Sequence, residues 1–309
     1  MAKLRSKRVF ILGGGASLGA HQVGALKLLE EQGVEPDAIV GSSIGVLNAC
    51  LYASGGVELL ESVWTGVRTL GMLRPSLRHN PVTGLSFFSA DPFARAVEPH
   101  IDFEALRRSP LELSFILLNL SRGRGEFFSN QHVKDLDEMR QLVRAGYALP
   151  GVFPPVRFRG DWYADGGLAW NVPLLQAVEM GATEIFVLAL ISTELPYKER
   201  FTGLSDYFGR LLDVLWTVLG NAGYSTTRIE DDGTYRGVPV TVIQPSEAYA
   251  GLDVVRLLSS NPERSRRLVT TGYADAKREL ARLARLRERD QREAPVLAAP
   301  EPAFRNEVA

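Results

Sequence analysis

A serine between glycines is the residue of this chain best placed to act as a nucleophile. Ser43 is the central residue of Gly41-Ser42-Ser43-Ile44-Gly45, a G-x-S-x-G pattern. An expected short strand at 37–40 precedes it and a helical pattern at 46–53 follows it, so the motif occupies a turn from strand to helix. Such a turn exposes the serine hydroxyl at a helix N-terminus, which favours developing negative charge. The pattern predicts nucleophilic catalysis, although G-x-S-x-G also arises by chance.

A glycine-rich loop lies between the first expected strand and the first expected helix. It contains Gly13, Gly14 and Gly15 and ends at Gly19. Glycines let several backbone N–H groups point into one concavity, which suits an anion. A plain tight turn explains the loop equally well. Binding of a dinucleotide is a third interpretation, but Leu18 stands where G-x-G-x-x-G has its last glycine.

An aspartate in a tight turn could remove the proton from Ser43. Asp165 is followed by Gly166 and Gly167, a combination that is also common in simple turns. A serine hydroxyl is a poor nucleophile until a base takes its proton. No histidine follows His132, so none lies beyond Asp165, where the serine, acid, histidine order of the α/β-hydrolases would require one. The sequence therefore favours a carboxylate that acts as the base directly.

Together these motifs resemble the patatin-like phospholipases. A further block, Arg144 to Pro155, is similar to the family's A-x-P-x-x-F-P-P segment, and Gly24 and Asn171-Val-Pro173 also fit. The resemblance covers roughly residues 7 to 195. It implies Ser43 as nucleophile and Asp165 as general base.

The resemblance also implies an oxyanion hole and one departure from the family pattern. The expected donors are backbone N–H groups: those of Gly13, Gly14, Gly15 and Ile44. The elbow and turn glycines are Gly41, Gly45, Gly166 and Gly167. The family usually has Arg or Lys just before the last glycine of the loop, where this chain has Leu18. Headgroup preference and catalytic efficiency are the properties that this substitution puts in question.

The elements that position these residues alternate between strand and helix. Short apolar runs at 9–12, 37–40, 184–190 and 238–243 predict strands, and a hairpin is expected over 113–129. This order predicts a three-layer α/β/α patatin-like sandwich around a mostly parallel sheet. We expect a catalytic domain at 7–195. A mainly helical C-terminal extension follows at 196–293, packed on it and with a strand near 238–243, and a disordered tail at 294–309.

Composition narrows the function classes. The chain has 309 residues, a formal net charge of −1 and one cysteine, Cys50. One cysteine predicts no disulfide framework and no cysteine-based zinc site. The family resemblance implies no metal and no organic cofactor. No nucleic-acid motif is present, and no apolar run is long enough to span a bilayer. We expect a cytoplasmic protein that can associate peripherally with membranes, with the helix at 265–292 either packed on the domain or lying on the membrane surface. Oligomeric state stays open.

The sequence hypothesis is a lipid acyl hydrolase that cleaves carboxylic esters at a membrane or micelle surface. Two rivals stay open. A lipid-binding or scaffold protein on the same fold would share the motifs without turnover. A reductase that uses NAD(P) would draw on the glycine loop and on Tyr273 and Lys277, a Y-x-x-x-K pattern, but would leave Ser43 and Asp165 unexplained.

Overall fold

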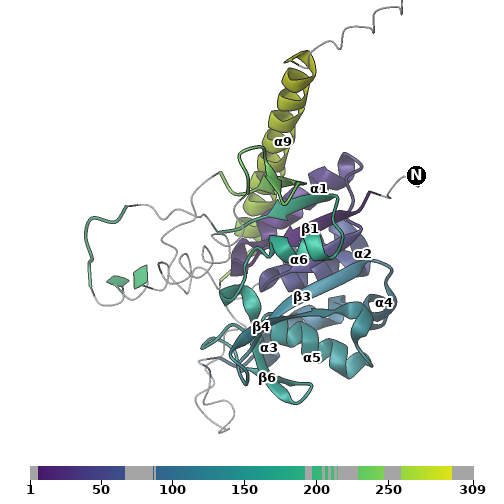
Figure 1. Ribbon diagram of the computed structural model, residues 1–309. Coiled ribbons are helices and arrows are strands. Elements are labelled where there is room, and N and C mark those ends of the chain that lie inside the picture. Colours follow the sequence, from purple (N-terminus) through teal and green to yellow (C-terminus); the bar gives the residue numbers. More distant parts are fainter. Residues whose placement is uncertain are drawn as a thin grey trace, which may run out of the picture.

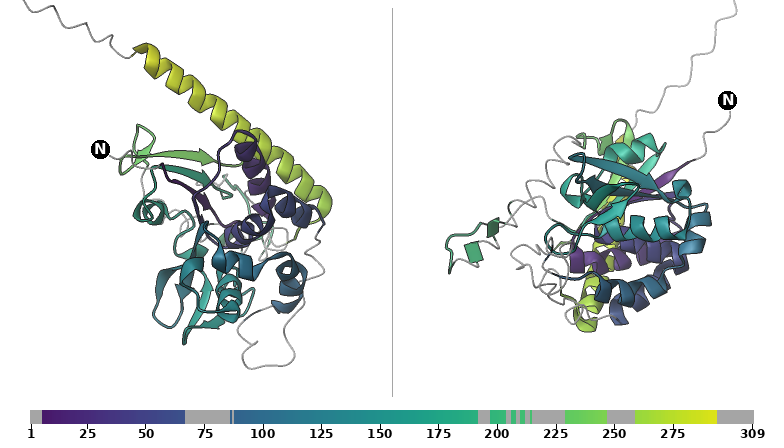
Figure 2. Two further views of the ribbon diagram at one scale, coloured as in Figure 1. Left: turned by 90° about the vertical axis from the view of Figure 1, so that its right-hand side faces the viewer. Right: turned by 90° about the horizontal axis from the view of Figure 1, so that it is seen from below.

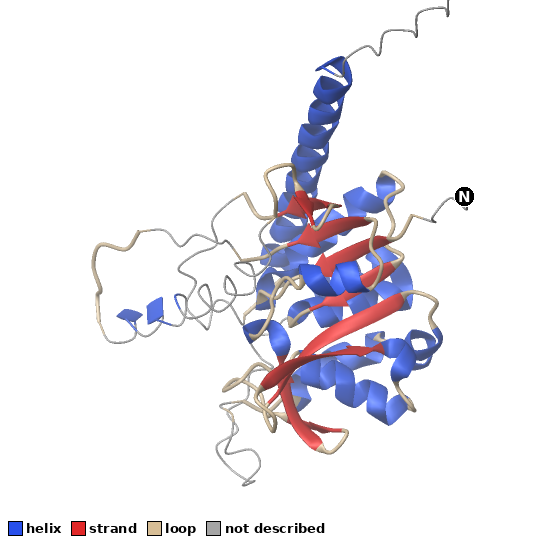
Figure 3. Ribbon diagram, in the orientation of Figure 1, coloured by secondary structure: helices blue, strands red, loops and turns tan. Residues whose placement is uncertain are grey.

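A nine-stranded sheet forms the centre of the computed structural model (Figures 1 and 3). The structure describes residues 6–66, 86, 88–191, 197–203, 206, 207, 210, 211, 214, 229–246 and 259–293. The strands are β1 (Arg8–Leu12), β2 (Ala38–Gly41), β3 (Glu112–Asn119), β4 (Arg124–Ser129), β5 (Val156–Phe158), β6 (Asp161–Asp165), β7 (Glu184–Leu188), β8 (Thr234–Tyr235) and β9 (Val238–Ile243). Their order is β5-β6-β3-β2-β1-β7-β9-β8, with β4 pairing to β3.

The core of the sheet is parallel, which confirms the expected fold class. Five neighbouring strands, β3, β2, β1, β7 and β9, run in one direction. The expected hairpin is the antiparallel pair β3–β4, and β6 also joins β3 in antiparallel fashion. Because β9 pairs with β7, the sheet continues past residue 195 into the expected extension.

Alternation along the strands explains the layers. Phe10 and Leu12 of β1 belong to one apolar cluster, and Val9 and Ile11 belong to another on the opposite face. The described helices are α1 (Ala20–Glu31), α2 (Ile44–Gly66), α3 (Asp91–Val97), α4 (Phe103–Arg108), α5 (Leu136–Gly146), α6 (Leu174–Glu179) and α9 (Pro262–Glu293). The larger cluster lies under α1, α2, α5 and the first part of α9, while α6 covers the other face.

Helix α2 continues beyond the end that the sequence predicted. Gly55 and Gly56 interrupt it with non-helical backbone, and Gly56 has a positive φ of 69°. The helix then resumes and runs on to Gly66, so the glycine pair produces a kink instead of a stop. Its second part places Trp64 and Val63 against the core. The kink matters because these two residues line the pocket described below.

The C-terminal helix α9 packs tightly on α1. A Cβ atom at Gly24 would lie 1.9 Å from the Val269 carbonyl oxygen, and one at Gly272 would lie 1.9 Å from that of His21. The two helices therefore approach through their glycines. Figure 2 shows α9 against the domain over its first part and projecting beyond it further on. No helix in the described part of the chain is long and apolar enough to cross a membrane.

Candidate active site

The register of the strands brings the three predicted motifs to one edge of the sheet. Leu12 of β1 pairs with Gly41 of β2, and Gly41 pairs with Phe115 of β3. Ser43, two residues past Gly41, therefore comes level with Leu117, whose partner on β6 is Asp165. The glycine loop leaves the end of β1 at the same level. Ser43, Asp165, Gly14 and Gly15 line one cleft.

Ser43 has the strained backbone of a sharp turn. Its φ is +55°, a conformation that non-glycine residues rarely adopt. The turn is tight because α2 begins directly against β1: a Cβ atom at Gly45 would lie 1.9 Å from the Leu12 carbonyl oxygen. A Cβ atom at Gly41 would lie 3.0 Å from the Val46 backbone N. The two glycines thus allow the close approach that turns Ser43 out of the sheet.

Asp165 is a buried carboxyl group with a perturbed pKa. Its side chain is 1% exposed, and its Oδ1 accepts the Gly167 N–H at 2.8 Å. Burial raises the pKa of Asp165 to about 6. The nearby Ser43 hydroxyl and the Gly167 N–H oppose part of that rise. A carboxyl group with a pKa near 6 can accept a proton at neutral pH more readily than an exposed one.

The turn that follows Asp165 is held against the elbow. A Cβ atom at Gly166 would lie 2.4 Å from the Ile116 carbonyl oxygen of β3. A Cβ atom at Gly167 would lie 3.0 Å from Ser42 Oγ. Both glycines of the motif therefore sit where a side chain would push Asp165 away from Ser43.

The glycine loop contributes fewer free N–H groups than the sequence predicted. Gly13 donates its N–H to the Leu188 carbonyl oxygen at 3.2 Å, as a continuation of the sheet. Gly13 is therefore not available as an oxyanion donor. Gly14 donates to Asn171 Oδ1 at 2.5 Å. The N–H groups of Gly15 and Ile44 make no hydrogen bond to a described residue. Ile44 is the first residue of α2, where backbone N–H groups have no partner within the helix.

Comparison with known proteins identifies the fold family. The family model described as patatin-like phospholipase matches residues 10–178, more than half of the chain. The chain belongs to the patatin-like phospholipase family. The match contains the glycine loop, the elbow and the Asp165 turn, and it ends inside α6.

Sequence relatives and a solved structure agree with this assignment. The chain is 29% identical over 180 residues to the lysophospholipase nte1 of Aspergillus terreus, covering 58% of this chain and 11% of that protein. It is 26% identical over 211 residues to the Emericella nidulans lysophospholipase nte1, covering 68% and 13%. The chain thus spans only about a tenth of the length of these relatives. The fold resembles VipD from Legionella pneumophila, with a TM-score of 0.51, 13% identity, and coverage of 89% and 67%.

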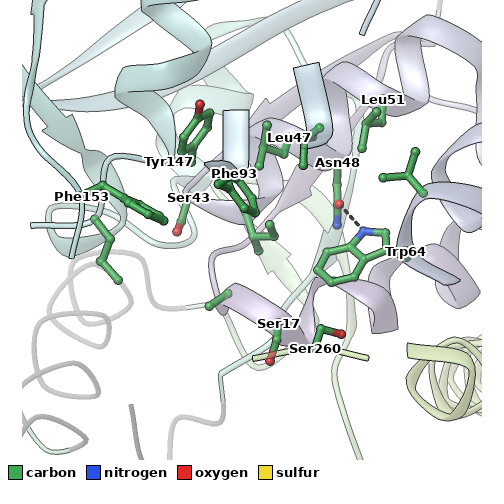
Figure 4. A pocket seen from close by; sticks show the side chains of 15 residues that line it. Ser17, Ser43, Leu47, Asn48, Leu51, Trp64, Phe93, Tyr147, Phe153 and Ser260 are labelled. Atoms are coloured by element: carbon green, nitrogen blue, oxygen red, sulfur yellow. Dashed lines mark hydrogen bonds between the residues drawn. The ribbon is translucent and has the colours of Figure 1, made fainter. Parts of the chain in front are cut away.

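An apolar pocket opens beside Ser43 of this patatin-like domain (Figure 4). Along α2, Ile44, Leu47, Asn48 and Leu51 have the spacing of one helix face and lead away from the serine. Opposite them the wall is aromatic, with three rings in mutual contact: Phe93, Tyr147 and Phe153. Val63 and Trp64 also line the pocket.

The segment between the elbow and the β3–β4 hairpin contains large apolar residues that, from the sequence alone, could either line a channel for an acyl chain or pack in the core. They are Trp64, Leu70, Phe87, Phe88 and Phe93. Trp64 and Phe93 line the pocket while also contributing to the core, and Phe88 packs against the core without lining the pocket. Phe87 and Leu70 lie outside the described residues.

A buried polar network joins the pocket to the glycine loop, and sequence reasoning missed it. Trp64 Nε1 donates to Asn48 Oδ1 at 2.8 Å, and Asn48 Nδ2 donates to Gln22 Oε1 at 2.7 Å. Gln22 Nε2 in turn donates to the carbonyl oxygens of Gly13 and Leu188, at 2.8 and 2.9 Å. The only signal in the sequence was Asn48, a polar residue on an otherwise apolar face of α2. The network fixes the start of the loop against β7.

Two other residues near the glycine loop, Leu18 and His21, lie outside the cleft. Leu18 is buried in the core, so the position that is usually basic in the family carries an apolar packing residue here. His21, at the start of α1, is not in the cleft. Its Nε2 lies 2.9 Å from Asp275 Oδ2 of α9, and both side chains are buried.

Proposed function

We propose that this chain hydrolyses carboxylic esters of lipids through an acyl-enzyme formed on Ser43. One observation carries the proposal: a strained serine at a helix N-terminus shares a cleft with a buried carboxyl group of pKa about 6. An apolar pocket that also includes Ser43 offers space for an acyl chain. Membership of the family and the similarity to lysophospholipases support a lipid as the substrate.

In the first half of the reaction Ser43 Oγ attacks the ester carbonyl carbon while Asp165 takes the hydroxyl proton. The carbonyl oxygen becomes an oxyanion. We assign its stabilisation to the N–H groups of Gly15 and Ile44, because the N–H groups of Gly13 and Gly14 already have partners. Collapse of the intermediate breaks the ester C–O bond, and Asp165 returns the proton to the departing alcohol.

In the second half a water molecule replaces the alcohol. Asp165 takes a proton from this water, whose oxygen attacks the acyl carbon of the Ser43 ester. The second oxyanion collapses, the fatty acid leaves, and the proton returns to Ser43 Oγ. One carboxyl group therefore serves as base and acid in both halves, and no histidine is needed.

Hydrolysis of a lipid panel by matched serine variants tests the proposal. We expect Ser43→Ala to lose on the order of 10³-fold or more of the turnover of lysophosphatidylcholine or of another ester in the panel. The control is Ser42→Ala, which alters the adjacent buried serine and should retain most activity. Equal loss in both variants, or full activity in a folded Ser43→Ala, would contradict the assignment.

A further inference from the structure

Exposed apolar side chains gather in one short stretch of the chain. Among the described residues, seven large apolar side chains are exposed, and five of them fall between residues 197 and 214. They are Tyr197, Phe201, Tyr207, Leu211 and Val214, which we call the 197–214 patch. Tyr197 is 90% exposed. Apolar residues scattered singly need no explanation, but a concentration of this kind marks an interaction surface.

The patch has internal order. The Phe201 and Tyr207 rings meet edge to face with centroids 5.6 Å apart, and Lys198 Nζ lies 5.5 Å from the Phe201 ring centre. Lys198 also pairs with Asp206. Tyr207, Leu211 and Val214 are helical and follow the i, i+4, i+7 spacing of a single helix face. These three apolar side chains therefore share one side of the helical part of this segment.

The patch belongs to the edge of the domain that carries the proposed active site. Leu190, just after β7, packs so close to the glycine loop that a Cβ atom added at Gly15 would touch its side chain. The next residue, Ile191, lines the cleft with Ser43 and Asp165. The chain reaches Tyr197 six residues later. In Figure 1 the described part of the segment lies away from the body of the domain, on the side where β1 and β7 end.

We propose that the 197–214 patch is the surface through which this protein binds a phospholipid bilayer or micelle. The proposal rests on the proposed function, because a lipid ester must enter the cleft from such an aggregate. Tyrosines and phenylalanine mixed with Lys198, Arg200 and Arg210 have the composition of membrane–water interfaces.

The charges of the segment indicate which lipid it binds. Between residues 197 and 214 the sequence has three basic residues and three acidic ones, so the net charge of the segment is zero. Attraction to anionic lipid is therefore weak, and burial of the apolar side chains dominates. Binding to zwitterionic phosphatidylcholine should change less than about threefold between low and high salt.

This assignment replaces the C-terminal helix as the membrane contact. The apolar side of the first part of α9 is already used: Leu268, Val269 and Ala276 are buried in the core cluster. The arrangement agrees with the alternative in which that helix is packed on the domain.

Flotation of the full chain with phosphatidylcholine vesicles tests the proposal. The Phe201→Ser/Tyr207→Ser variant should partition roughly tenfold more weakly than wild type. It should keep its kcat/KM for a short water-soluble ester and lose hydrolysis on vesicles in proportion to binding. Leu120→Ser, which removes an exposed apolar side chain from the β3–β4 turn, is the matched control and should bind as wild type.

Three results would overturn the assignment. They are unchanged flotation of the double variant, a loss as large in Leu120→Ser, and a wild-type dimer that the double variant dissociates without any vesicle binding. Ser43→Ala separates this proposal from the catalytic one, since it should float normally. If the wild-type protein cleaves no ester but the double variant still loses flotation, the membrane-binding surface is supported and only the proposed activity is refuted.

Discussion

Asn171 Oδ1 accepts a hydrogen bond from the Gly14 N–H at 2.5 Å, so the segment after Asp165 holds the glycine loop beside Ser43. Asn171 Nδ2 lies 3.5 Å from the Gly14 carbonyl oxygen, and the side chain is buried. A Cβ atom at Gly14 would lie 2.8 Å from both Asn171 Oδ1 and Ser43 Cβ. Asn171 thus sets the distance between the loop and the proposed nucleophile.

We predict that Asn171→Ala lowers kcat roughly 10- to 100-fold with little change in KM, because the loop loses its position relative to the oxyanion. Steady-state kinetics on a short chromogenic ester measures both constants. Asn130→Ala is the control, since Asn130 is also a buried asparagine and binds backbone groups of Leu106 and Leu113, away from the cleft. A higher KM at unchanged kcat in Asn171→Ala would refute this positioning role.

The ionisation of Asp165 should govern the pH dependence of activity. The proposed base must be deprotonated, and burial raises its pKa to about 6. We therefore expect kcat/KM to rise with pH through about 6 and to level off above it. The pH profile of ester hydrolysis checks this expectation. A profile that is flat from acid to neutral pH, measured on folded protein, would contradict it.

The same shift predicts an opposite effect on stability. Because the pKa of Asp165 is higher in the folded chain than its usual value of 3.8, folding favours the protonated form. Its contribution is intact below the usual value and is lost as pH rises through about 6. Asp165→Asn should therefore unfold at a higher temperature than wild type at about pH 8, with a smaller difference near pH 5.

Asp161→Asn is the matched control for that measurement. Hydrogen bonds from Arg122 and Asn119 lower the pKa of Asp161, so its ionised form is the favoured one. Replacing it should not stabilise the fold at any pH. If the melting temperature of Asp165→Asn falls below that of wild type at about pH 8, the ionised Asp165 carboxylate does not destabilise the folded chain and the prediction is wrong.

The His21–Asp275 pair should matter for stability and not for chemistry. Burial lowers the pKa of His21, which keeps the ring neutral at pH 7, while its hydrogen bond helps to hold the pKa of buried Asp275 low. His21→Ala removes one hydrogen-bond partner of the buried Asp275 carboxylate and should cost about 2 kcal/mol of unfolding free energy. Denaturant unfolding measures the loss. A folded His21→Ala as inactive as Ser43→Ala would restore a histidine-based mechanism.

The depth of the apolar pocket should set the acyl-chain preference. Leu51 lies eight residues beyond Ser43 along α2, or about 12 Å at the helical rise. We expect Leu51→Phe to reduce kcat/KM for long-chain esters at least tenfold while short-chain esters are cleaved as before. Leu51→Met, close in volume, is the control. An equal loss for all chain lengths would show that the acyl chain does not reach Leu51.

Much of this site could be predicted from local sequence, because its key residues lie in short loops with a marked composition. Gly41 and Gly45 flank Ser43, and two glycines follow Asp165, so each motif is visible within a few residues. The parallel sheet follows from short apolar strands that alternate with helices. What brings Ser43 level with Asp165 is the register of β2, β3 and β6, which connects residues far apart in sequence.

The misjudged details depend on the same long-range contacts. The Gly13 N–H donates to Leu188 and the Gly14 N–H donates to Asn171. These bonds could be predicted only with the knowledge that β7 and the segment after Asp165 flank the loop. Gln22 and Asn48 are buried polar residues whose partners lie on other elements. The position of His21 was equally out of reach, because Asp275 follows it by 254 residues.

The most direct test of the account is the site and rate of covalent labelling by a fluorophosphonate. The reagent reacts with a serine whose proton a base removes, so wild type should carry one adduct, on Ser43, located by peptide mass mapping. Asp165→Asn should label at the same serine but roughly 10²- to 10⁴-fold more slowly, since the amide cannot take the proton. An adduct on Ser42, or an Asp165→Asn variant that labels as fast as wild type, would contradict the Ser43–Asp165 pair.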